Sequence, residues 1–101
     1  MESDQYRVVW TLAAQWKLKE IVAQILEAAP SRAIPFGRKL ERAVATLSRS
    51  PLRCSRTPEN PSYRQLVVKR YRVIFHVNTD EVIIATIVYP YQIFRSEKLG
   101  E

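Results

Sequence analysis

The sequence predicts an α+β domain in which a helical hairpin covers one side of a single, mostly antiparallel sheet. Three strand-like runs, rich in Val, Ile, Tyr and Phe, follow one another over residues 63–91 with turn signals between them. Two segments with helical spacing of apolar residues precede them, over residues 11–48. A short alternating run at residues 5–10 supplies a first strand. The predicted order is therefore an N-terminal strand, an antiparallel helical hairpin and a three-stranded antiparallel meander that completes the sheet.

The first strand and the first helix meet at Thr11. Tyr6, Val8 and Trp10 alternate onto one face of the strand, and Thr11 has a side chain suited to cap a helix N-terminus. Pro30 ends the helix. The apolar residues between them recur at a spacing of three and four, which is typical of an amphipathic helix: Leu12, Trp16, Leu18, Ile21, Val22, Ile25, Leu26 and Ala29.

The second helix has a less defined start, because Pro35 lies inside it and proline is favoured only in a first turn. It is expected to begin near Ser31, which can cap it, or near Pro35. Pro51 stops it, and the proline-containing stretch 48–62 is expected to be an exposed loop. The apolar face of this helix is clear from its second half: Phe36, Leu40, Ala43, Val44 and Leu47.

Composition limits the class of protein. At 101 residues, with 47% apolar and 26% charged residues, the chain is expected to be one globular domain over residues 1–101. The longest apolar run is too short to span a bilayer and the N-terminus is too polar for a secretory signal. Cys54 is the only cysteine, so no internal disulfide can form and the cytoplasm is the expected location. No metal-ligand spacing or glycine-rich phosphate loop is present, so we expect no metal and no cofactor.

The net charge of +6, from 16 basic and 10 acidic residues, favours an anionic partner. Nucleic acid, the ribosome and an acidic protein all fit this description. The basic residues are dispersed, however, so a surface that simply carries excess Lys and Arg is an equal alternative.

The turn at residues 78–81 sets the predicted register of the last two strands. A two- or four-residue loop places Val77 opposite Val82 and Arg72 opposite Ile87, whereas a three-residue loop would exchange the faces. A tight turn at Lys69-Arg70 would bring in the preceding strand. The outer face would then hold Tyr63, Gln65, Val67, Arg72, Ile74, His76, Ile83, Ala85, Ile87, Tyr89 and Tyr91. The face toward the helices would hold Leu66, Val68, Tyr71, Val73, Phe75, Val77, Ile84, Thr86 and Val88.

Arg72 is the leading candidate for a functional residue, because an arginine on a non-core strand face has little structural reason to be there. Tyr89 and Tyr91 are its expected neighbours. His76 lies about 13 Å further along the strand, so it does not share a ligand with Arg72. The alternatives are ordinary ones: a surface ion pair for the arginine, surface polarity for His76 and strand-forming aromatics for the tyrosines.

The chain resembles the RelE/ParE toxin superfamily. The resemblance rests on the order of elements, on Arg64-x-Leu66, on Tyr71-Arg72-Val73-Ile74-Phe75-x-Val77 and on a final strand that ends in Tyr89-Pro90-Tyr91. It extends from Tyr6 to about Phe94. It implies a toxin of a type II toxin–antitoxin (plasmid stabilisation) module, neutralised by an antitoxin protein whose tail wraps the toxin.

The RelE-like branch implies cleavage of mRNA in the ribosomal A site, by attack of a 2′-hydroxyl on the adjacent phosphate. Arg72 would then stabilise the charge that develops on the phosphate, and Tyr91 would stack on a base or share in proton transfer. The resemblance and the basic surface add further candidates for binding nucleic acid or another target: Tyr63, Arg64, Lys69, Arg70, His76 and Tyr89.

Departures from the RelE pattern keep two further readings open. Tyr63 and Gln65 stand where RelE has lysines, and Pro90-Tyr91 stands where other members have histidine or a second arginine. Glu59, His76 or Arg95 would have to supply the missing groups. The ParE-like branch inhibits DNA gyrase by binding and needs no catalytic residues, so the departures raise this alternative. The first hypothesis remains a RelE-like, ribosome-dependent mRNA endonuclease. A toxin-derived module that has lost activity and only binds is the third reading.

Overall fold

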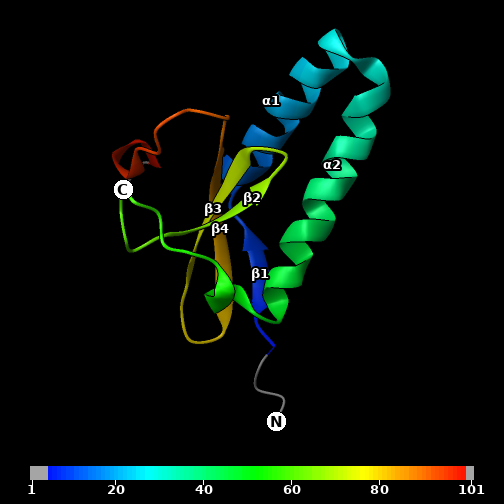
Figure 1. Ribbon diagram of the computed structural model, residues 1–101. Helices are drawn as coiled ribbons and strands as arrows, with labels where there is room; N and C mark the ends of the chain where they lie inside the picture. Colours follow the sequence, from blue (N-terminus) through cyan, green and yellow to red (C-terminus); the bar gives the residue numbers. More distant parts are fainter. Residues whose placement is uncertain (1–4, 100–101) are drawn as a thin grey trace.

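The computed structural model describes residues 5–99, and it confirms the predicted α+β fold. One four-stranded sheet has the order β1-β4-β3-β2, and a helical hairpin packs on one of its faces (Figure 1). Strand β1 runs parallel to β4, whereas the other two pairings are antiparallel. The strands are β1 Arg7–Trp10, β2 Arg64–Val68, β3 Tyr71–Val77 and β4 Glu81–Val88. The helices are α1 Leu12–Ala28 and α2 Pro30–Ala45, with 3-10 turns at Thr46–Ser48, Pro51–Arg53 and Ser96–Leu99.

Thr11 caps α1 as the sequence predicts. Its hydroxyl oxygen accepts a hydrogen bond from the Ala14 amide at 3.1 Å and donates to the Ile84 carbonyl at 2.8 Å. The cap therefore also ties the helix N-terminus to β4. Ala29 alone separates the two helices, and Pro30 occupies the first turn of α2, where its missing N–H costs nothing. Ser31 lies inside the helix, so its predicted capping role is wrong.

The hairpin buries its apolar face on the sheet. On α2 the predicted residues Phe36, Leu40 and Val44 are buried. On α1 the buried residues are Ala14 and Ile21, and the rest of the predicted stripe is only partly covered. Three of its members are more than half exposed, contrary to the expectation for a core face: Leu12, Trp16 and Leu26. No helix in residues 5–99 is long and apolar enough to cross a membrane.

The β3–β4 hairpin follows the predicted register at its tip and then departs from it. Val77 pairs with Val82, as expected. A β-bulge beside Ile74 and Phe75 then leaves Ala85 as an extra residue of β4. Arg72 consequently lies opposite Val88, so the predicted pairing with Ile87 is wrong.

The bulge exchanges the faces of the last part of β4. Ile87 and Tyr89 pack with the main core under the helices, whereas Val88 packs with Ile74 on the outer face. The predicted placement of Ile87 and Tyr89 beside Arg72 is therefore wrong, and so is the predicted core position of Val88.

The two-residue turn at Lys69-Arg70 is confirmed, with Val67 paired to Arg72. Lys69 has φ 51° and Arg70 has φ 74°, so both adopt left-handed backbone conformations. Such a turn matches the twist of a hairpin but favours Asn-Gly, because Gly has no Cβ and Asn tolerates the left-handed conformation better than Lys or Arg does. The sequence thus keeps two cations at positions that disfavour them.

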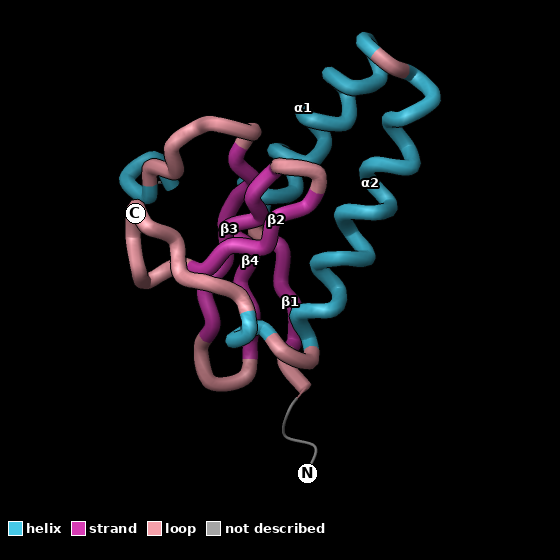
Figure 2. The backbone as a smooth tube through the Cα atoms, in the orientation of Figure 1, coloured by secondary structure: helices cyan, strands magenta, loops and turns pink. Residues whose placement is uncertain are grey.

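The outer face of the sheet is covered in part by the segment after β4. Phe94 is only 3% exposed and forms a second apolar cluster with Ile74 and Val88, against which Tyr63 and Leu99 pack. The connection before β2 lies next to this segment, and Figure 2 shows both on the side of the sheet away from α2. The expected open outer face is therefore partly closed.

Candidate functional site

Arg72 lies on β3 at the centre of a hydrogen-bonded cluster that we call the Arg72 clamp. Its Nη1 donates to Glu59 Oε1 at 3.1 Å and to Gln65 Oε1 at 2.8 Å. Its Nη2 donates to Glu59 Oε2 at 2.8 Å and to the Gln92 carbonyl at 2.9 Å. The side chains of Arg72 and Glu59 are only 16% and 22% exposed. The guanidinium is thus already occupied by protein acceptors.

Glu59 completes the clamp from the loop before β2. Its Oε2 also accepts the backbone N–H of Phe94 at 3.1 Å. The hydrogen bond from Arg72 is the main reason that the pKa of Glu59 falls to about 2. The carboxylate is therefore ionised at neutral pH and neutralises the arginine. Sequence reasoning placed Glu59 among possible replacement groups, but only the folded chain brings it to Arg72.

Tyr91 does not join Arg72. Its side chain is 89% exposed, and its hydroxyl accepts a hydrogen bond from Arg70 Nη1 at 3.0 Å. Its φ of 68° is left-handed, like those of Lys69 and Arg70. The two predicted catalytic residues therefore take part in separate contacts, Arg72 with Glu59 and Tyr91 with the β2–β3 turn.

Tyr89 lies on the helix side of the sheet. Its hydroxyl donates to Glu20 Oε2 on α1 at 2.9 Å, and its ring centroid lies 5.9 Å from that of Tyr71. Burial and then the Glu20 carboxylate raise the pKa of Tyr89 to about 12. Its contacts join α1 to the sheet.

His76, Tyr63 and Arg64 have contacts within the fold. The rings of His76 and Tyr63 pack edge to face at 5.6 Å, and Tyr63 packs on Phe94 in the same way at 5.1 Å. Arg64 Nη1 donates to the Cys54 carbonyl at 2.6 Å, which holds the loop before β2. Burial is the main cause that raises the pKa of the Cys54 thiol. Within residues 5–99, no group of three His, Cys, Asp or Glu side chains could hold a metal ion.

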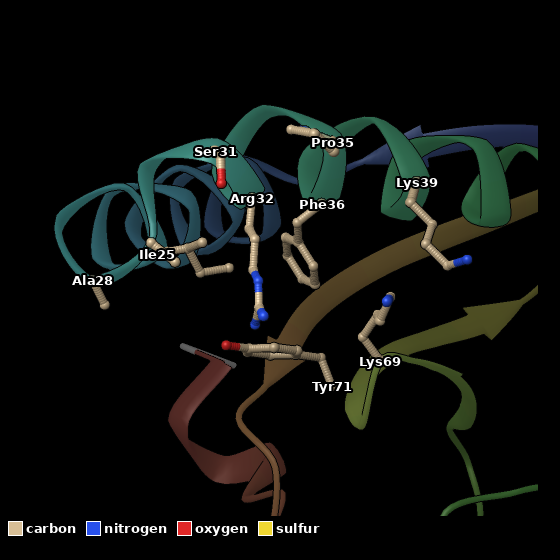
Figure 3. A pocket seen from close by; sticks show the side chains of 10 residues that line it. Ile25, Ala28, Ser31, Arg32, Pro35, Phe36, Lys39, Lys69 and Tyr71 are labelled. Atoms are coloured by element: carbon tan, nitrogen blue, oxygen red, sulfur yellow. The ribbon is translucent and has the colours of Figure 1, made fainter.

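A groove of about 690 Å³ lies between the helical hairpin and the β2–β3 turn. Phe36 and Tyr71 are among its apolar lining residues. Arg32, Lys39 and Lys69 also line it, from α2 and from the strained turn (Figure 3). None of these three cations forms an ion pair with another described residue. The groove therefore combines an apolar lining with positive charge.

A second hollow, of about 510 Å³, lies between α1 and the segment after β4. Trp16 and Ile93 line it and are 68% and 65% exposed. Sequence reasoning missed both as functional candidates, since it assigned Trp16 to the core and gave Ile93 no role. The sequence did contain a signal for Trp16. The apolar stripe on α1 is wide, and the sheet and α2 leave three of its residues more than half exposed.

Two solved structures of similar fold come from toxin–antitoxin systems. The chromosomal ParDE toxin–antitoxin system from P. aeruginosa matches with a TM-score of 0.78 at 22% identity, covering 87% of this chain and 99% of the other. The RelBE2 toxin–antitoxin complex from Mycobacterium tuberculosis matches with a TM-score of 0.59 at 23% identity, covering 87% and 94%. The fold is thus that of the RelE/ParE toxins.

The family model for the ParE toxin of the type II toxin–antitoxin system parDE matches residues 8–89. This chain belongs to the ParE toxin family. No sequence among the curated proteins matches it.

Proposed function

We propose that this chain is a toxin that arrests growth by binding a protein target, and that the target is DNA gyrase. The Arg72 clamp is the observation that carries the proposal. A ribonuclease site needs a cation that faces the phosphate and groups that move protons. Here the cation is neutralised by Glu59, and its other partners, the Gln65 amide and the Gln92 carbonyl, do not titrate.

Cleavage of mRNA on the ribosome is the second candidate. It would make Arg72 and Tyr91 catalytic residues and the cations of the β2–β3 turn RNA-binding residues. For that, Glu59 would have to leave the guanidinium and Tyr91 would have to leave Arg70. The binding mechanism requires neither change, and membership of the ParE family agrees with it.

A cognate antitoxin is the second partner that we propose. The structures of similar fold come from a toxin–antitoxin system and a toxin–antitoxin complex. The net charge of +6 and the groove lined by Arg32, Lys39 and Lys69 would favour an acidic antitoxin. Gyrase as the target would place the action of the toxin in the cytoplasm.

The test compares the two mechanisms with one preparation. Purified toxin is added to DNA gyrase with relaxed plasmid, and in parallel to ribosomes programmed with mRNA whose ends are mapped by primer extension. We expect inhibited supercoiling and intact mRNA. Ribosome-dependent cleavage with unaffected supercoiling would overturn the proposal in favour of the RelE-like mechanism, and harmless expression of the chain without antitoxin would favour the inactive module.

A further inference from the structure

We infer that Trp16 and Ile93 form the apolar anchor by which this chain docks on its protein target. The matching surface on the target would be an apolar pocket surrounded by carboxylates. The inference rests on the proposed function, because it assigns a docking surface to a toxin that acts by binding. Arg72 itself is not among the residues that line this surface.

The exposure of Trp16 and Ile93 is the first observation. Two large apolar side chains line one hollow, and each leaves about two thirds of its surface uncovered. Scattered apolar residues on a surface are ordinary, but neighbouring ones beside a hollow are typical of an interaction site. Tryptophan is also the residue type most enriched among those that dominate binding energy.

The Arg72 clamp holds Ile93 in place. Arg72 fixes the carbonyl of Gln92 and Glu59 fixes the amide of Phe94, which are the residues on either side of Ile93. Phe94 is buried in the outer cluster, whereas Ile93 remains exposed at the hollow. The main chain is therefore anchored on both sides of an exposed apolar residue. The clamp thus fixes the backbone that presents Ile93.

Charge around the hollow indicates the chemistry of the partner. Lys17, Arg95 and Lys98 line it, against the single carboxylate of Glu20. That carboxylate already accepts the hydroxyl of Tyr89. Arg95 forms a long ion pair of 4.0 Å with Glu97, whereas Lys17 and Lys98 form none with another described residue. The surroundings of the apolar anchor therefore keep an excess of positive charge, and an acidic surface is their electrostatic complement.

The test removes the anchor without touching the core. Trp16→Ala/Ile93→Ala is compared with Leu26→Ala/Ile34→Ala, which truncates two side chains that are 53% and 57% exposed and do not line the hollow. Both variants should unfold at the temperature of the wild type. We expect the first to need at least about tenfold more protein to inhibit gyrase and to lose growth arrest at equal expression, since dominant interface residues cost that much when truncated. The second should behave as the wild type.

The outcomes separate the docking surface from the identity of the target. Equal inhibition and growth arrest by both variants would overturn the docking surface and leave the proposed function standing. Growth arrest by the wild type without gyrase inhibition would overturn gyrase as the target. In that case, loss of growth arrest in Trp16→Ala/Ile93→Ala but not in the control variant would still support the docking surface. If the anchor variant loses only self-association or only antitoxin binding, the surface belongs to those partners and the inference is overturned.

Discussion

Glu59 and Arg72, 13 residues apart in the chain, form a two-bond ion pair that joins the loop before β2 to the middle of the sheet. The same two side chains hold the backbone of Gln92 and Phe94. One arginine therefore connects β3 with the loop before β2 and with the segment after β4. This gives the arginine a structural role on the outer face of the sheet, beside the apolar cluster of Ile74, Val88 and Phe94.

Arg72→Ala should lower the free energy of unfolding by about 2 to 4 kcal/mol, because it removes the cation paired with Glu59, which keeps only the Phe94 N–H, and the donor to the Gln92 carbonyl in a largely covered position. Urea denaturation measures the change. Arg7→Ala is the matched control, since the Arg7 side chain that pairs with Glu81 is 69% exposed and water can replace it, so its loss should cost under about 1 kcal/mol. Equal effects of the two substitutions would contradict the clamp.

Acid should weaken the clamp through Glu59. Its pKa falls from 4.5 to about 2 on folding, so its contribution to stability is complete above pH 4.5 and is lost as the pH falls toward 2. Because solvent still reaches the pair, the loss should be about 1 to 2 kcal/mol.

Glu59→Gln removes this titration, so its unfolding free energy should fall less steeply than that of the wild type in the same pH window. Glu97→Gln is the control, because Glu97 is exposed and its ion pair with Arg95 is long, at 4.0 Å, so its ionisation should contribute little to stability. Parallel pH profiles for the wild type and Glu59→Gln would refute the assignment.

Lys69→Asn/Arg70→Gly should raise the free energy of unfolding by about 1 to 2 kcal/mol, because Asn-Gly fits the left-handed turn without the strain of Lys and Arg. Chemical denaturation measures the gain. Lys69→Gln/Arg70→Gln removes the same charges but keeps the strain, and it should not stabilise. If both double variants stabilise equally, charge repulsion rather than backbone strain is the cause.

Thr11→Ala should destabilise the fold by about 1 to 2 kcal/mol, because it removes both the cap of α1 and the bond to the Ile84 carbonyl. Thr11→Ser keeps the hydroxyl and should recover most of the loss. Thr46→Ala, which removes an exposed hydroxyl bonded to the Ala43 carbonyl, serves as the control for general threonine loss. Thermal unfolding ranks the three, and a Thr46 effect as large as that of Thr11 would contradict the double role of the cap.

The sequence predicts the elements of this fold well because their signals are local. Thr11 marks the start of α1, and the two-residue turn at Lys69-Arg70 follows from two strand-like runs that flank it. The turn before Glu81 predicts the register correctly as far as Phe75 and Ile84.

The bulge in β4 and the contacts of Arg72 could not be predicted, because they depend on residues that are distant in the sequence. Ala85 carries no sign of a bulge, since it is neither glycine nor a turn residue, yet it reverses the faces of Ile87 and Val88. Glu59 lies in a loop whose path no periodicity defines. Arg72 therefore lies without its predicted neighbours, and both its functional importance and its catalytic role remain predictions.

The pairing of β1 with β4 has a consequence for how the toxin is made. Arg7 and Glu81 are neighbours in the sheet but 74 residues apart in the chain. During synthesis β1 has no partner until β4 has been translated, whereas the helical hairpin depends on local contacts and can form early. We expect the sheet to close only after β4 has been translated. A chain still on the ribosome would therefore lack the complete sheet, and with it the toxin fold, until β4 has been synthesised.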